Sequence, residues 1–170
     1  KVFDQMLESR ENIVLIGMPG CGKSTVGKIL SATLCRKFVD LDDEIVEYVG
    51  MSIPEIFAQY GENRFRELET LVLRERVCGM SGCVIATGGG APTFDENLSL
   101  LRRNGRLYFL DRPLEKLLPT DDRPLASSTV KIKALFAERY EKYTACADEI
   151  IKVAGDADQT AKIIAEKILK

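Results

Sequence analysis

The stretch GMPGCGKS, residues 17–24, constrains the fold of this chain more than any other feature. It matches the pattern GxxxxGK[ST], and the apolar run NIVLIG directly before it predicts a buried strand that leads into a loop. Glycines let the backbone turn tightly and approach a phosphate closely, so that successive N–H groups and the start of the next helix face the anion. The motif therefore predicts a phosphate-binding loop between a strand and a helix.

This loop supplies the groups that a nucleoside triphosphate needs. The amine of Lys23 would meet the β and γ phosphates, and the hydroxyl of Ser24 would bind Mg²⁺. We therefore expect ATP and Mg²⁺ as ligands, with Ser24 as a metal ligand. The predicted nucleotide-binding residues of the loop are Gly20, Cys21, Gly22, Lys23, Ser24 and Thr25.

Short apolar runs alternate with amphipathic segments along the chain, which predicts parallel strands joined by crossover helices. We predict a three-layer α/β/α sandwich with a central five-stranded parallel sheet, the P-loop NTPase fold. The predicted strands are residues 12–17, 37–40, 83–88, 105–111 and 149–153. The predicted helices are residues 23–36, 43–49, 54–60, 62–78, 95–103, 130–146 and 157–169.

Charge and composition exclude several classes of function. The formal net charge of -2 over 170 residues argues against a large basic face for nucleic acid. No apolar stretch approaches the roughly 20 residues that span a bilayer, so we expect no membrane association. The absence of histidine excludes histidine metal ligands and bases, and the five cysteines include no CxxC pair. We expect a reduced, cytoplasmic monomer, and a start at Lys1 rather than methionine is consistent with a longer fused polypeptide.

Four carboxylates crowd into the stretch FVDLDDEI, residues 38–45. Because this stretch follows the second predicted strand, its acids lie at the carboxyl edge of the sheet, where ligands of open α/β sheets bind. If the strand continues, Asp40 and Asp42 project to the same side, so one can face a metal ion and the other an acceptor hydroxyl. A solvated helix start is the simpler interpretation, and we keep it for Asp43 and Glu44, which would complement the helix dipole.

Three further segments are notable. Arg66 and Glu69 lie three apart on one helical face, a spacing that usually means an ordinary surface ion pair. The stretch ATGGGAP, residues 86–92, has three glycines after a buried strand and no hairpin partner, which indicates backbone that contacts a ligand closely. Residues 117–129 are rich in Pro, Asp, Ser and Thr and lack a hydrophobic period, which predicts a loop of the kind that forms lids.

Taken in order, these motifs resemble the shikimate kinases, small P-loop enzymes of the nucleoside monophosphate kinase type. The matching segments, within about residues 12–143, are GMPGCGKST, DLDDEI, SIPEIFAQYGENRFRELE, ATGGGAP, DRPLA and ERYEKY. The resemblance implies transfer of the γ-phosphoryl group of ATP to the 3-hydroxyl of shikimate, in the route through chorismate to aromatic amino acids. It also implies one kinase domain over residues 1–170, with core sheet and loop at about 12–37, a substrate-binding segment at about 40–70 and the lid at 117–129.

The same resemblance assigns roles around the acceptor. Asp42 would hydrogen-bond the acceptor hydroxyl as a base or orienting group, and Asp40 would help to hold Mg²⁺ through water. Arg66 and Arg139 would grip the shikimate carboxylate. The remaining predicted substrate contacts are Phe57, Phe65, Gly88, Gly89 and Gly90.

On the nucleotide side, Arg123 matches the lid arginine that reaches the phosphates, and Pro124 matches the position beside adenine. Asp42, Lys23 and Arg123 are the predicted catalytic residues. The lid departs from the family pattern because it is short and has Pro119 near the place where relatives carry another arginine.

Two alternatives remain at this level. One is another P-loop kinase for a small metabolite, such as a gluconate kinase or a nucleoside monophosphate kinase. The other is a nucleotide-binding regulatory module that has lost catalysis. The intact Lys23, Asp42 and Arg123 argue against the second alternative, because loss of catalysis would be expected to change at least one of them.

Overall fold

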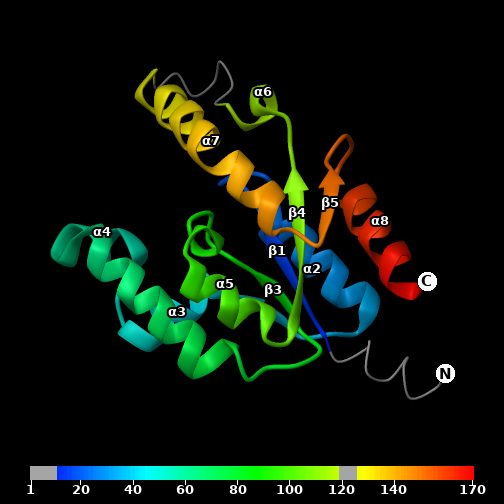
Figure 1. Cartoon of the computed structure of the whole chain (residues 1–170), viewed down its shortest axis with the longest axis horizontal. Coiled ribbons are helices and arrows are strands. Elements are labelled where there is room, and N and C mark those ends of the chain that lie inside the picture. The colour runs from blue at the N-terminus through cyan, green and yellow to red at the C-terminus, as the bar shows by residue number, and fades with distance from the viewer. Residues whose placement is uncertain (1–10, 119–125) are drawn as a thin grey trace.

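A computed structural model describes the backbone of residues 11–118 and 126–170, so Arg123, Pro124 and most of the predicted lid lie outside the described residues. Five parallel strands form one sheet in the order β2-β3-β1-β4-β5 (Figure 1). Their bounds are β1 Asn12–Ile16, β2 Phe38–Asp40, β3 Val84–Ala86, β4 Gly105–Asp111 and β5 Glu149–Lys152. The five predicted strands and the predicted sheet are therefore confirmed.

The central strand β1 is buried along its whole length because helices cover both faces of the sheet. It pairs with β3 on one side, where Val14 lies beside Ile85, and with β4 on the other, where Val14 lies beside Leu107. Apolar residues on both faces of a parallel strand explain why the sequence shows continuous runs rather than alternation. Since all strands are parallel, the loops after β1, β2 and β3 meet at one edge of the sheet.

The helices form two layers around the sheet (Figure 1). Helix α2 packs against α8, whereas α5 packs against η1 and η2 and both α5 and α7 contact β4. The main helices are α2 Lys23–Leu34, α3 Leu41–Val49, α4 Ile53–Val72, α5 Asp95–Arg102, α7 Ala126–Cys146 and α8 Ala157–Leu169. Short segments are the π-helix η1 Leu73–Val77, the 3₁₀-helix η2 Ala91–Thr93 and α6 Leu114–Leu117.

Several helices start earlier than predicted. Helix α3 starts at Leu41 rather than residue 43 because the Asp40 side chain accepts hydrogen bonds from two N–H groups of the first turn. Helix α7 starts at Ala126 rather than residue 130, and the short helix α6 was not predicted. The predicted break near residue 61 is confirmed, because Gly61 has φ 84° inside α4.

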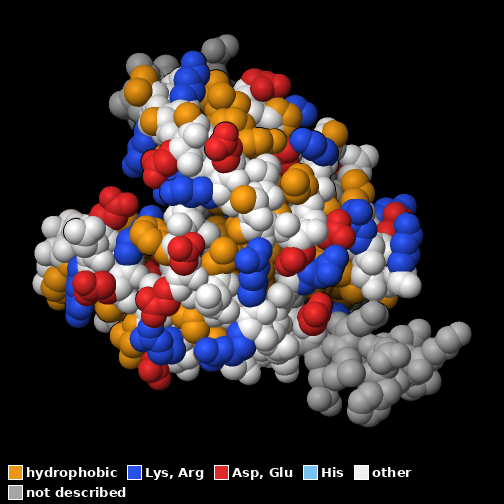
Figure 2. Space-filling view, in the orientation of Figure 1, with side chains coloured by type: hydrophobic (Ala, Val, Ile, Leu, Met, Phe, Trp, Pro, Cys, Tyr) orange, Lys and Arg blue, Asp and Glu red, His pale blue; other side chains and the backbone are white. Residues whose placement is uncertain are grey.

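The surface carries both signs of charge. Figure 2 shows Lys and Arg side chains interspersed with Asp and Glu over the visible face. In the part of the chain that the structure describes, no helix has the length and apolar character needed to cross a membrane.

Candidate functional site

The loop after β1 encloses a cavity of about 380 Å³ at the carboxyl edge of the sheet, named here the loop cavity. Gly20 and Gly22 have φ values of 82° and 100°, in the left-handed region that glycine adopts without steric cost. Gly22 also precedes the first residue of α2, so the amino end of this helix opens toward the cavity. Five of the predicted nucleotide-binding residues line it: Gly20, Gly22, Lys23, Ser24 and Thr25.

Lys23 lies back against its own loop. Its Nζ donates hydrogen bonds to the carbonyl oxygens of Gly17 at 2.7 Å and Met18 at 3.0 Å. Phosphate oxygens would be stronger, charge-assisted acceptors for the same amine. Cys21 does not line the loop cavity, because the residue is only 2% exposed and its thiol lies 3.7 Å from the Lys23 Nζ in the interior.

Ser24 and Asp40 bring two oxygen ligands together beside the loop. The Ser24 hydroxyl donates a 2.9 Å hydrogen bond to Oδ2 of Asp40, and both residues line the loop cavity. Oδ1 of Asp40 accepts from the backbone N–H groups of Asp42 at 2.9 Å and Asp43 at 3.4 Å, which fixes the carboxylate. Mg²⁺ prefers oxygen ligands and commonly keeps several waters, so two protein oxygens beside phosphates are enough. The pair fits a magnesium ion bound partly through water.

Asp42 lies where the loop cavity meets a second one. Asp40 and Asp42 do not share a strand face, contrary to the prediction, because β2 ends at Asp40 and Asp42 belongs to the first turn of α3. Burial, and then repulsion from Asp40, raise the pKa of the Asp42 carboxyl, against the opposing effect of Lys23. A carboxylate with a raised pKa is a stronger base, which suits it to accept a proton from a hydroxyl.

The second cavity, named the larger cavity, has a volume of about 530 Å³, which is enough for a small metabolite. Phe57 and Phe65 form an aromatic wall, with ring centroids 4.6 Å apart. Phe65 is buried, whereas Phe57 is 38% exposed. All predicted substrate residues line this cavity: Asp42, Phe57, Phe65, Arg66, Gly88, Gly89, Gly90 and Arg139.

Arg66 and Glu69 form a buried pair rather than the ordinary surface ion pair that their spacing suggests. The Glu69 side chain has no exposed area and that of Arg66 is 17% exposed, with Nη1 of Arg66 3.0 Å from Oε1 of Glu69. Burial raises the pKa of the Glu69 carboxyl, and Arg66 opposes this rise. Nε of Arg66 and Oε2 of Glu69 have no hydrogen-bond partner in the structure. Glu69 therefore holds a cation at the edge of the larger cavity.

Helix α7 contributes one of its faces to the larger cavity. The residues on this face, at positions i, i+3, i+4, i+7 and i+11 of the helix, are Ser128, Lys131, Ile132, Leu135 and Arg139. Except for Arg139, they are absent from the prediction, although the spacing is visible in the sequence. A helical period alone predicts a face that packs against something, and it does not distinguish a core from a ligand cavity.

Each glycine of the turn Gly88–Gly90 lies against a different charged side chain of the larger cavity. A β-carbon on Gly88 would lie 3.2 Å from Oδ1 of Asp42, and one on Gly89 would lie 3.0 Å from Nη1 of Arg139. A β-carbon on Gly90 would overlap the guanidinium of Arg66. This glycine turn is therefore the point at which one carboxylate and two guanidinium groups converge.

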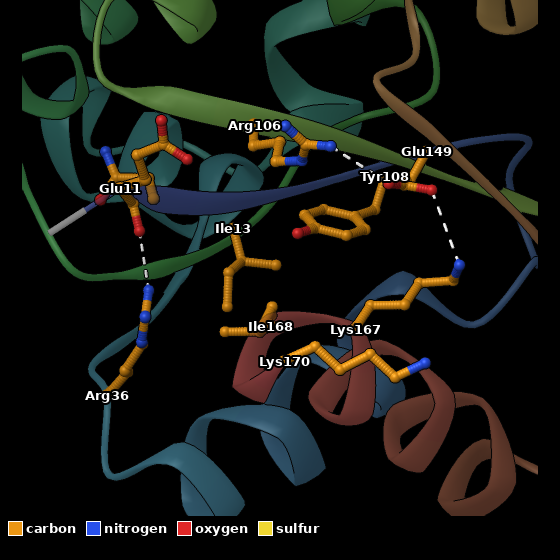
Figure 3. A pocket seen from close by; sticks show the side chains of 10 residues that line it. Glu11, Ile13, Arg36, Arg106, Tyr108, Glu149, Lys167, Ile168 and Lys170 are labelled. Carbon is orange, nitrogen blue, oxygen red and sulfur yellow. Dashed lines mark hydrogen bonds and ion pairs between the residues drawn. The ribbon is translucent and has the colours of Figure 1, made fainter. Parts of the chain in front are cut away.

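Another cavity, of about 290 Å³, lies at the amino ends of β1, β4 and β5, away from the phosphate loop (Figure 3). Its central charges already pair with one another, because Arg106 and Lys167 contact Glu149 at 3.1 and 3.7 Å. Arg36 donates a 2.7 Å hydrogen bond to the backbone carbonyl of Glu11. Prior pairing of these cations makes this cavity a weaker candidate for the functional site.

Comparison with known proteins adds independent information. The family model of shikimate kinase matches residues 19–170. A shikimate kinase of Clostridium beijerinckii is 41% identical over 164 residues, which cover 94% of this chain and 96% of that protein. A shikimate kinase of Geobacter sulfurreducens is 43% identical over 159 residues, which cover 91% of this chain and 87% of that protein.

A solved structure agrees with the sequence relatives. The structure of shikimate kinase from Acinetobacter baumannii in complex with shikimate superposes with a TM-score of 0.87 and is 36% identical. The match covers 97% of this chain and 96% of that chain. The predicted P-loop kinase fold is thereby confirmed.

Proposed function

The chain belongs to the shikimate kinase family, and we propose that it transfers the γ-phosphoryl group of ATP to the 3-hydroxyl group of shikimate and that the residues described above perform this reaction. The observation that carries the proposal is the position of Asp42, which lines both the loop cavity and the larger cavity. A carboxylate at this boundary can contact an acceptor hydroxyl in one cavity while the γ-phosphate lies in the other.

In the proposed reaction, Asp42 accepts the proton of the 3-hydroxyl group while the hydroxyl oxygen forms a bond to the γ-phosphorus. The bond between that phosphorus and the β–γ bridging oxygen breaks, and ADP leaves with the electron pair. Phosphoryl transfer depends mainly on positioning and charge neutralisation, so one carboxylate and a few cations form a sufficient set. The raised pKa of Asp42 supports its role as the proton acceptor.

We propose that Arg66 and Arg139 bind the carboxylate of shikimate from two elements, α4 and α7. Forked, charge-assisted hydrogen bonds would fix the direction of the ring. The glycine turn allows both guanidinium groups to approach it and offers backbone N–H groups to the ring hydroxyls. Phe57 and Phe65 would cover the apolar side of the ring.

On the nucleotide side, Lys23 would turn from its loop carbonyls to the β and γ phosphates, and Gly20 to Thr25 would surround them. Bound Mg²⁺ would neutralise phosphate charge, and Ser24 and Asp40, partly through water, are the proposed ligands. Arg123 and Pro124 lie outside the described residues. Their roles at the phosphates and beside adenine remain part of the proposal on the strength of the family motif.

The direct test is release of ADP with MgATP and, in turn, shikimate, gluconate and AMP as acceptors. We expect turnover with shikimate alone. Turnover with gluconate or AMP in place of shikimate would refute the proposal in favour of a related small-metabolite kinase. Binding of ATP without turnover of any acceptor would favour the inactive regulatory module.

We further propose that residues 1–170 act as one kinase domain and that the protein is a cytoplasmic monomer. The single sheet supports the first point, because every described strand belongs to it. Light scattering coupled to size exclusion tests the second, and a mass of twice 18.9 kDa would contradict it.

A further inference from the structure

Tyr143 lies directly behind the glycine turn. It has no exposed surface, and its hydroxyl donates a hydrogen bond to the carbonyl oxygen of Gly89. Its ring packs at 5.1 Å from that of Phe109 on β4. Burial raises the pKa of Tyr143 to about 12, although Arg139 opposes this rise. The phenol therefore stays protonated and remains a donor at physiological pH.

We propose that Tyr143 is a positioning residue for the acceptor site, which acts by fixing the orientation of the Gly89–Gly90 peptide. This inference rests on the proposed function of the larger cavity. Tyr143 lines neither that cavity nor the loop cavity, so it acts on a substrate only through the residues it holds.

Because the peptide bond is planar, a contact that fixes the Gly89 carbonyl also fixes the Gly90 N–H on the other side of the turn. The carbonyl of Gly89 and the N–H of Gly90 belong to one trans peptide unit, so they point in opposite directions. When Tyr143 holds the carbonyl, it also directs the Gly90 N–H away from itself. No described residue accepts a hydrogen bond from that N–H, which leaves it available to a ligand.

Two side chains of α7, Tyr143 and Arg139, lie against Gly89. Arg139 lies four residues before Tyr143, on the same helical face, and its Nη1 lies 3.0 Å from the place of a β-carbon on Gly89. A shift of α7 relative to the turn would therefore change both the guanidinium and the backbone that face the larger cavity. The hydrogen bond of Tyr143 keeps these two elements in a constant relative position.

The test compares Tyr143→Phe with Tyr140→Phe. The second change removes a hydroxyl three residues away, which donates a 2.8 Å hydrogen bond to Asp111 rather than to the glycine turn. We expect Tyr143→Phe to raise the KM for shikimate about tenfold, the size expected when a buried carbonyl loses its donor. The KM for ATP should stay unchanged, and Tyr140→Phe should leave the KM for shikimate at its original value.

Melting temperatures separate positioning from simple stability. Both variants should lose a few degrees, with the larger loss in Tyr143→Phe, because Asp111 keeps Lys152 as a partner in Tyr140→Phe whereas the carbonyl of Gly89 loses its donor. A normal KM for shikimate in Tyr143→Phe, whatever its melting temperature, would overturn the inference. Failure of the proposed function would appear in the unaltered enzyme instead, as no ADP release with shikimate, so the two failures are distinguishable.

A double-mutant cycle gives a second measurement that does not depend on the melting temperature. Since Tyr143 is proposed to act through the turn that Arg139 touches, Tyr143→Phe and Arg139→Lys should be coupled. The increase in KM for the double variant should be smaller than the product of the two separate increases. Independent, multiplicative effects would contradict the inference.

Discussion

Gly90 lies so close to the guanidinium of Arg66 that a β-carbon at this position would overlap it. Arg66 cannot retreat easily, because Glu69 holds its Nη1 at 3.0 Å and the ring of Phe65 lies 5.2 Å from its Cζ. The position of this cation therefore requires glycine at residue 90, independently of any contact between the backbone and a ligand.

Gly90→Ala should thus raise the KM for shikimate by tenfold or more and lower the melting temperature. The added methyl group must displace a guanidinium that is held in a buried ion pair, and overpacking of this kind costs about 1–3 kcal/mol. Gly79→Ala is the matched control, because a β-carbon there has no atom within 4 Å and the change should be nearly neutral. Steady-state kinetics and thermal unfolding of both variants test this, and an unchanged KM in Gly90→Ala would show that Arg66 can move freely.

Replacement of Asp42 by Asn should lower kcat strongly and leave the affinity for ATP nearly unchanged. The amide keeps the shape of the side chain but cannot accept the proton of the hydroxyl. The pKa of Asp42 is raised by burial, so kcat of the unaltered enzyme should fall on acidification at a pH above the ordinary carboxyl value of 3.8. A pH profile with the same acidic limb in Asp42→Asn would assign that limb to another group.

The same substitution should stabilise the fold at neutral pH. A raised pKa means that folded Asp42 binds its proton more tightly than the unfolded chain does, so the free energy of unfolding falls as pH rises from the unfolded pKa through the folded one. Asn avoids this loss, and the gain should vanish below both pKa values. Urea unfolding as a function of pH measures it. Asp43→Asn is the control and should give no gain, because Asp43 is exposed although it belongs to the same helix turn.

The structural features that depend only on residues adjacent in the sequence could be predicted. The phosphate loop follows from one contiguous motif, and the strands follow from buried apolar runs. The burial of Glu69 could not be predicted, because spacing three apart is the same on a solvated and on a covered helix face. The start of α3 could not be predicted, because it depends on whether Asp40 extends a strand or caps a helix. The contact of Tyr143 with Gly89 could not be predicted either, because it joins residues 54 apart in the sequence.

Arg139→Lys and Arg66→Lys should differ in their effects on stability although both raise the KM for shikimate. In both variants an ammonium group, which acts as a point charge, replaces a guanidinium group with two parallel N–H donors, so carboxylate binding should weaken about tenfold or more. Among the described residues no carboxylate forms an ion pair with Arg139, so Arg139→Lys should lower the melting temperature less than Arg66→Lys does. Arg66→Lys removes the 3.0 Å contact between Nη1 and Oε1 of the buried Glu69 and should cost about 1–3 kcal/mol. Equal melting temperatures for the two variants would contradict this distinction.

Asp40 serves two purposes, and two substitutions should separate them. Asn can still cap α3 by accepting from the N–H groups of Asp42 and Asp43, but it lacks the charge that a magnesium ion would meet beside Ser24. Asp40→Asn should therefore keep the native stability and raise the Mg²⁺ concentration for half-maximal activity about tenfold.

Asp40→Ala should show the same change in Mg²⁺ requirement and should also lose about 1 kcal/mol of stability, because the cap disappears. Urea unfolding and Mg²⁺ titration of ADP release distinguish the two effects. Ser52→Ala is a matched control, since the side chain of Ser52 caps α4 through the N–H of Glu55 at 3.3 Å and lines neither cavity. It should lower stability with no change in Mg²⁺ requirement. An unchanged requirement in Asp40→Asn would leave Asp40 only its role as a helix cap.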